Sequence, residues 1–267
     1  MAEKKQHKIK DAETGAQLNA AQVKEKEKQI KEAAPVGNAG SLRLGAVILW
    51  VVAIVFEVLA VLVAVGKINL KFMPTMWQLI VLLVLDLACV IVGAQLWKKA
   101  NHIKPASEAN KLKFWLWNNM GVIACVVAFV PVIVILLTNK DLDKKTKVIA
   151  TVVAIIALLI GGVSSYDFNP VSVEQQQAAM TALGDEAVYW APFGKVYHTH
   201  EDCSSLNQSD ELTIGTVEQA IAANRTRLCS FCAKRDNITG VVTDKTADDV
   251  IEEVTEIVDD LQTENAA

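Results

Sequence analysis

Four apolar runs, joined by short polar connections, constrain the fold of this 267-residue chain most strongly. A helix needs about 20 apolar residues to cross roughly 30 Å of hydrocarbon. A buried helix of a soluble protein would explain one such run, but hardly four in succession. Because backbone polar groups in lipid must be satisfied within the segment, we expect transmembrane helices. Their expected bounds are 44–66, 76–96, 114–138 and 148–166.

The rest of the chain is polar, and its composition divides it into three parts. Residues 1–43 are predicted to be a charged tail. Within it, residues 20–33 are expected to form a marginally stable helix or no regular structure. A small module with clustered cysteines covers 187–235, and 236–267 is an acidic tail with a helical apolar stripe. No cleaved signal peptide is expected, because the first apolar run begins only at Leu44.

The Lys and Arg residues near the span ends predict the orientation. The N-terminal flank and the loop 97–113 together hold ten, and the two loops on the opposite face hold six. Since basic residues concentrate on the cytoplasmic side, both termini are expected in the cytoplasm. The net charge of −4 gives no indication of a nucleic-acid partner.

A Cys/His pattern in the last third of the chain predicts a metal site. His198 and Cys203 are followed, after twenty-five residues, by Cys229 and Cys232. One imidazole and three thiols are the ligands of a closed tetrahedral Zn²⁺ site, and a reducing cytosol favours metal binding over disulfides. His200 is an alternative first ligand, because it also precedes Cys203 at a suitable spacing. Cys89 and Cys125 lie within the apolar runs, and we expect them to be small apolar packing residues.

Local signals around these residues predict a small α+β fold. The β-prone triplets 188–190 and 195–197 flank a Pro- and Gly-containing turn, and so predict a hairpin that ends at His198. Thr216 and Gln219 have the spacing of a capping box, which predicts a short helix up to about Ala223. With so few apolar positions, metal binding would supply the missing folding free energy.

The module resembles small bacterial zinc-binding domains that are similar in layout to the metal-binding fold of the Ada DNA-repair protein. The resemblance covers roughly 187–235 and none of the apolar runs. It rests on the run 190–198 and on Cys203, Leu206, Gly215, Thr216, Val217, Glu218, Ala220, Ile221, Arg225 and 229–232. It implies a zinc-bound α+β module and supports His198 as first ligand. With the four apolar runs, we expect a bacterial inner-membrane protein. The Ada domain uses four cysteines and transfers a methyl group to one; the histidine here argues against that activity.

Basic residues surround the second cysteine pair. They are Arg225, Arg227, Lys234 and Arg235. They could bind phosphate or nucleic acid, or offset the negative charge of a centre with three thiolates. The second interpretation is favoured, because no aromatic residues alternate with them.

Two carboxylates lie near the middle of apolar runs, Glu57 in the first and Asp86 in the second. An ionisable group at that depth is a candidate functional group. The pair could form an ion or proton pathway, or join helices as neutral hydrogen-bonding acids. The second interpretation is favoured, because a transporter usually needs more polar lining.

Together these features predict an all-α membrane bundle of four helices, followed by an α+β zinc module and an acidic helical tail. We expect a non-enzymatic, multi-pass membrane protein whose cytosolic module binds a macromolecule or senses a state. The expected partners are the lipid bilayer and a protein bound by the module or the acidic tail, not nucleic acid. A small ion or proton transporter using Glu57 and Asp86 is the main alternative. A zinc hydrolase using His200 or Glu201 is a weaker one.

Overall fold

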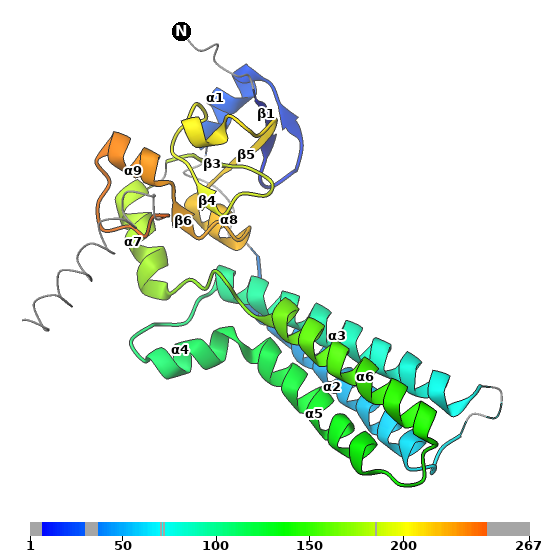
Figure 1. Cartoon of the computed structure of the whole chain (residues 1–267). Helices are drawn as coiled ribbons and strands as arrows, with labels where there is room; N and C mark the ends of the chain where they lie inside the picture. The colour runs from blue at the N-terminus through cyan, green and yellow to red at the C-terminus, as the bar shows by residue number, and fades with distance from the viewer. Residues whose placement is uncertain (1–6, 30–36, 70, 72, 185, 245–267) are drawn as a thin grey trace, which may run out of the picture. The chain divides into compact units, whose positions relative to one another are not determined.

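The computed structural model describes residues 7–29, 37–69, 71, 73–184 and 186–244. They divide into two units: a helical bundle over 37–173, and an α/β unit that combines the N-terminal segment with the residues from 174 onward (Figure 1).

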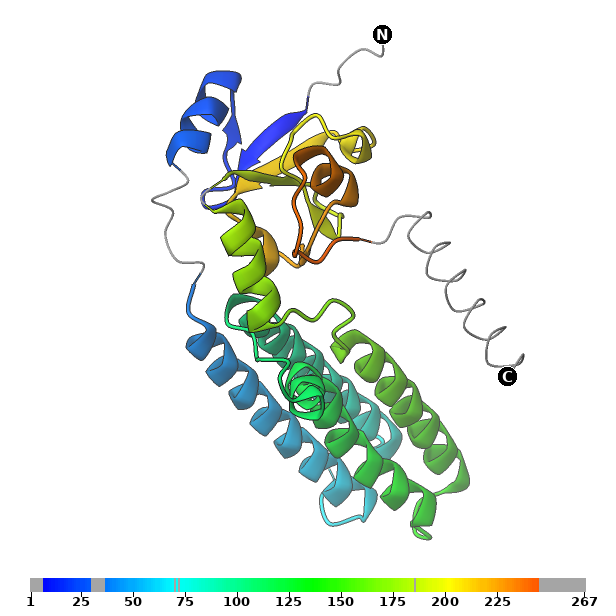
Figure 2. The same ribbon diagram turned by 90° about the vertical axis from the view of Figure 1, so that its left-hand side faces the viewer.

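Four long helices form the bundle and confirm the predicted membrane fold. They run side by side in both views (Figure 2), and each is long and apolar enough to cross a bilayer. Asn38 caps the first and Asp143 the fourth by accepting backbone N–H bonds. The helices are α2 (Ala39–Ala64), α3 (Thr75–Ile103), α5 (Met120–Thr138) and α6 (Lys144–Ser165).

The third span begins later than the sequence suggested, because a separate helix precedes it. Residues assigned to the start of that span form α4 (Lys111–Asn118), which Asn119 separates from α5 and which lies at an angle to α5 in Figure 1. Leu112 and Trp115 of α4 are exposed. An amphipathic helix with lysines and exposed apolar side chains suits the membrane interface better than its interior.

The α/β unit is built on a four-stranded sheet in the order β2-β1-β5-β3, and a two-stranded sheet pairs β4 with β6. In the larger sheet, β1 runs parallel to β5 and β3 runs antiparallel to it. The strands are β1 (Lys8–Asp11), β2 (Gln17–Leu18), β3 (Val188–Trp190), β4 (Val196–Tyr197), β5 (Glu211–Gly215) and β6 (Arg227–Leu228). The helices are α1 (Ala20–Gln29), α7 (Val173–Leu183), α8 (Val217–Ala222) and α9 (Ser230–Asp236), with a 3₁₀ turn at Ser204–Leu206.

The N-terminal segment differs from the polar tail expected from its composition. Ile9 of β1 pairs with Leu212 of β5 and is buried. Tyr189 Oη donates a hydrogen bond of 2.5 Å to Glu27 of α1. Because these partners lie far along the chain, local composition gave no sign of them. The α/β unit is thus larger than the predicted module, and its core includes residues from both ends of the sequence.

Two local predictions in this unit are confirmed. Tyr189 and His198 exchange backbone hydrogen bonds of 2.8 and 2.7 Å, which closes the expected hairpin. Thr216 and Gln219 form the reciprocal capping box at the start of α8. Asn224 follows α8 with a positive φ of 67°, a conformation that asparagine tolerates at helix ends. The apolar stripe expected beyond residue 244 lies outside the described residues.

Candidate metal centre

Four short segments position the four Cys and His side chains predicted as ligands. His198 directly follows β4, and Cys229 directly follows β6; these two strands pair in parallel. Cys229 N donates to Tyr197 O at 2.9 Å, which holds the two strand ends together. Cys232 lies in the first turn of α9, so the C-x2-C spacing places both sulfurs at the start of that helix. Cys203 comes from the loop before the 3₁₀ turn.

The structure brings these four side chains into one buried cluster. Their candidate ligand atoms all lie within 4.8 Å of one another. Cys203 Sγ is 3.8 Å from Cys229 Sγ, and Cys232 Sγ is 3.8 Å from His198 Nδ1. A tetrahedral ion with bonds of about 2.3 Å to sulfur separates two sulfurs by about 3.8 Å. The spacing therefore fits a metal ion held at the centre, with His198 Nδ1 as the nitrogen ligand.

The same distances do not fit a disulfide. A disulfide needs sulfurs about 2.05 Å apart, and all five cysteines are free thiols in this structure. Of these, Cys89 and Cys125 lie in the bundle, in α3 and α5, and Cys125 is buried in its core. They do not join the cluster, as the sequence suggested.

The electrostatics of the cluster favour a bound cation. Burial opposes charge on the His198 ring, but its contacts with Cys229 and Cys232 outweigh burial and raise the pKa of His198 to about 9. Hydrogen bonds with Cys203, Cys232 and His198 lower the pKa of Cys229 despite its burial. The two shifts have different causes: the sulfurs favour the charged form of His198, and neighbouring donors favour the thiolate of Cys229. A divalent cation would stabilise the same thiolate, because a coordinating thiol is deprotonated.

His200, the alternative ligand, points to a different partner. Its Nε2 lies 2.8 Å from Asp236 Oδ1, and the side chain is about one third exposed. Thr199 Oγ1 donates to the other oxygen of Asp236 at 2.5 Å. His200 thus helps to fix the end of α9 and lies outside the buried cluster. Glu201 is exposed.

The arginines near the second cysteine pair bind backbone and acidic groups. Arg225 donates to the carbonyl oxygen of Ala191 at 2.9 Å, and also to those of Pro192 and Ala223. Arg235 forms an ion pair of 2.9 Å with Asp202. Neither arginine contacts a sulfur, so the expected offset of the thiolates is not made by direct hydrogen bonds from these two. Arg225 instead stabilises the turn between β3 and β4 through these hydrogen bonds.

Sequence reasoning missed the residues that support the cluster from outside it. Cys229 Sγ lies 3.7 Å from Ser205 Oγ, within reach of a weak hydrogen bond to sulfur. Asp244 Oδ1 accepts a 2.6 Å hydrogen bond from Ser230 N, next to Cys229. Asp244 follows the cysteine pair by more than ten residues, and its acidic surroundings gave no signal of this contact.

The two carboxylates predicted within the membrane lie inside the bundle. Glu57 of α2 is 9% exposed and Asp86 of α3 is fully buried, on helices that pack along each other. Neither carboxylate oxygen of Asp86 has a hydrogen-bond partner among the residues that the structure describes. Such a group is unusual, because buried polar atoms are nearly always paired.

Comparisons with family models, curated proteins and solved structures give no match. The resemblance to small zinc-binding domains therefore stays a hypothesis based on the residues of 187–235. The fold and the cluster themselves define the class: a multi-pass membrane protein with a buried Cys/His site able to hold a metal ion.

Proposed function

We propose that this protein anchors a zinc-stabilised module at the cytoplasmic face of a membrane, where the module binds a macromolecular partner without catalysing a reaction. The buried His198–Cys203–Cys229–Cys232 cluster carries the proposal. Thiolates and imidazole are ligands typical of Zn²⁺. Four protein ligands complete a tetrahedron, whereas a catalytic zinc keeps one position for water or substrate.

The pairing of strands supports a topology in which the segments before and after the four helices lie on one side of the membrane. Because β1 and β5 belong to one sheet, the segments before and after the four helices must lie on the same side of the bilayer. An even number of crossings meets this condition. The excess of Lys and Arg on that face favours the cytoplasm, and its reducing chemistry would keep the thiols available for metal.

An exposed aromatic side chain supports a binding role for the module. Phe193, in the turn between β3 and β4, is 99% exposed. Arg225 holds this turn through the carbonyl oxygens of Ala191 and Pro192. An aromatic side chain presented on a fixed turn loses little conformational entropy on binding, and aromatic residues are frequent energetic anchors of interfaces.

Metal analysis of the full-length protein in detergent tests the metal part of the proposal. We expect one zinc per chain by elemental mass spectrometry. Cys229→Ser should abolish the stoichiometric zinc, because three ligands from this cluster bind more weakly than four. Cys89→Ser, a cysteine of the bundle, is the matched control and should retain it. A well-folded wild-type protein that contains no metal would contradict the proposal.

Photocrosslinking in the native membrane tests the binding part. A photoreactive amino acid at position 193 of the full-length chain should give a discrete adduct of reproducible mass. The same amino acid at the exposed position Gln208, in the same unit, serves as control and should give none. Equal, diffuse labelling at both positions would count against a partner at this turn.

A second function is favoured by one observation, the unpaired buried carboxylate of Asp86. A cation or proton bound near Asp86 and Glu57 could move along the bundle. Flux in proteoliposomes that is lost in Asp86→Asn but kept in Cys229→Ser would support transport. If wild type, Asp86→Asn and Cys229→Ser all show no flux, only the binding function remains.

A further inference from the structure

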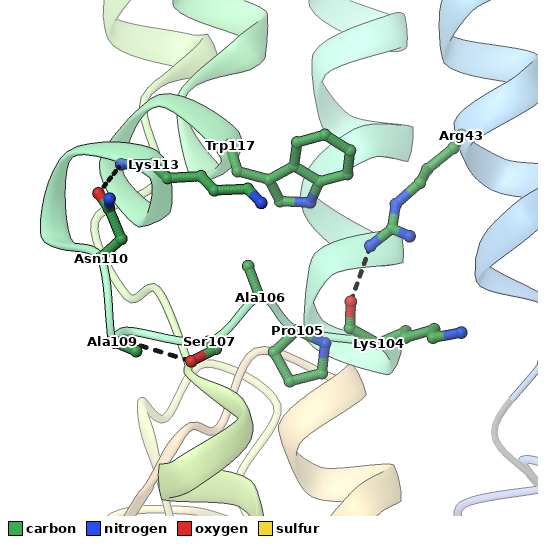
Figure 3. A pocket seen from close by; sticks show the side chains of 9 residues that line it. All are labelled: Arg43, Lys104, Pro105, Ala106, Ser107, Ala109, Asn110, Lys113 and Trp117. Atoms are coloured by element: carbon green, nitrogen blue, oxygen red, sulfur yellow. Dashed lines mark hydrogen bonds between the residues drawn. The ribbon is translucent and has the colours of Figure 1, made fainter.

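A cavity opens at the end of the bundle where α3 leads into α4 (Figure 3). Its volume is about 480 Å³, within the range of about 300–1,000 Å³ that small-molecule sites occupy. It is lined by Arg43 of α2, by residues 104–107, 109 and 110 of the connection, and by Lys113 and Trp117 of α4. The cavity wall carries three basic side chains and no carboxylate. Its charge therefore selects an anion.

Arg43 is already positioned before any ligand binds. Its Nη2 donates to Lys104 O at 2.7 Å and to Asn101 Oδ1 at 3.2 Å. The guanidinium also lies over two indole rings, 5.8 Å from the centre of Trp97 and 5.3 Å from that of Trp117. Its Nε has no hydrogen-bond partner among the described residues. A guanidinium fixed in this way loses little conformational entropy on binding an anion.

Lys113 supplies a second cation to the same space. In Figure 3, the side chains of Lys113 and Arg43 extend toward Trp117 from opposite sides. The Lys104 side chain extends away from the indole, so it adds to the potential without facing the centre. Two cations that line one cavity suit a compact anion such as a phosphate group, which accepts several charge-assisted hydrogen bonds.

The surroundings place the cavity at the depth of lipid headgroups. Trp50, Trp97 and Trp117 contact one another in sequence, with tilted rings whose centres are 5.4 and 5.1 Å apart. Tryptophans gather where hydrocarbon meets water. The exposed Leu112 and Trp115 of α4 fit the same boundary. Basic pockets between membrane helices at this level are suited to anionic headgroups.

We propose that this cavity binds a negatively charged phosphate group, with Arg43 and Lys113 as its direct ligands. The site is separate from the metal centre, since its lining comes wholly from residues 43–117 of the bundle. An anionic phospholipid headgroup and a soluble phosphate share this chemistry, and the experiment distinguishes these two sources.

Native mass spectrometry of the full-length protein in detergent provides the test. The probes are dioleoylphosphatidylglycerol, oleate as an anion without phosphate, and inorganic phosphate. We expect a one-to-one complex with the phosphatidylglycerol and none with oleate at the same concentration. Lys113→Gln should weaken the complex about tenfold, the effect of 1.4 kcal/mol, and Arg43→Gln by at least as much. Lys67→Gln, at the opposite end of the bundle, is the control and should leave it unchanged.

Lys113→Gln keeps the proposal testable if Arg43→Gln fails to fold, because only the Lys113 backbone, and not its side chain, makes a hydrogen bond in the described structure. Binding of inorganic phosphate that depends on Lys113, without binding of the lipid, would support the site and identify a soluble source. Lipid binding that is equal in wild type, Lys113→Gln and Lys67→Gln would overturn the proposal, as would equal binding of oleate.

Discussion

The two units differ most in what they expose. The bundle buries small residues such as Ala53 and Ala94 together with large ones such as Phe129, while Val, Ile and Leu side chains cover its exterior. The α/β unit buries large residues, including Tyr197 and Ile214. A surface of large aliphatic side chains is stable against lipid but not against water, so the exteriors alone indicate two different solvents.

Different forces therefore hold each of the two units together. In lipid, burying a leucine gains little, so the bundle relies on close approach of small residues and on van der Waals contact. In water, the α/β unit gains folding free energy from burying aromatic and aliphatic area. Its short strands and helices need further stabilising interactions. The proposed metal and the N-terminal strand supply such interactions. Each prediction below changes one of these forces in one unit.

Metal removal should have the largest effect and should be confined to the α/β unit. Structural zinc contributes an apparent 10–16 kcal/mol in zinc-finger peptides, more than the total stability of most domains. After chelation of the full-length protein, peptides from 186–244 should lose protection against hydrogen exchange. Peptides from α2 and α3 should keep theirs, and added zinc should restore the pattern. Unchanged protection after proven metal loss would show that the centre is not needed for folding.

Shortening Ile9 tests whether the N-terminal strand belongs to the α/β core. Ile9→Ala should destabilise that unit by about 2–5 kcal/mol, because a buried isoleucine loses its contacts and leaves a cavity. Hydrogen exchange of peptides that contain β5 gives the measurement. Lys8→Ala, at the exposed neighbouring position, should change little. If both variants exchange like wild type, the β1–β5 pairing does not form in solution.

The same comparison explains what the sequence could and could not predict. Four spans were recognisable because hydrophobic length is a local property of the chain. The cysteine cluster was recognisable because its spacing is local within each pair, although only the fold decides between His198 and His200. The pairing of Ile9 with Leu212 was not recognisable, since two polar-flanked segments some two hundred residues apart carry no local sign of each other. The cavity beside Arg43 was not recognisable from the sequence for the same reason.

A glycine in the bundle tests the close approach of its helices. A Cβ at Gly121 would collide with the Cβ of Ala94 and lie 3.1 Å from that of Ser165. Gly121→Ala should therefore destabilise the bundle by about 1–3 kcal/mol through overpacking. At Gly162 a Cβ meets nothing within 4 Å, so Gly162→Ala should be neutral or stabilising through helix propensity. Thermal unfolding in detergent compares them; equal melting temperatures would argue against tight packing at Gly121.

The smallest predicted effect concerns an ion pair of the α/β unit. Lys26 lies 2.8 Å from Asp11 and 3.2 Å from Glu13, with its side chain 15% exposed. Burial opposes its charge, but these contacts outweigh burial and raise the pKa of Lys26 above its ordinary 10.5. The stabilisation is thus fully present below about pH 10.4 and is lost as the pH rises through the raised pKa.

Replacing this lysine by an uncharged side chain of similar length isolates the charge. Lys26→Met should cost about 0.5–1 kcal/mol at pH 8, and the difference from wild type should shrink above pH 10.5. The alkaline range is chosen because it keeps thiolates ionised, so the proposed metal stays bound during the titration. Lys28→Met, at an exposed position of the same helix, is the control. Denaturant unfolding followed by hydrogen exchange of α1 peptides measures both; a difference independent of pH would mean that Lys26 acts through packing and not through its charge.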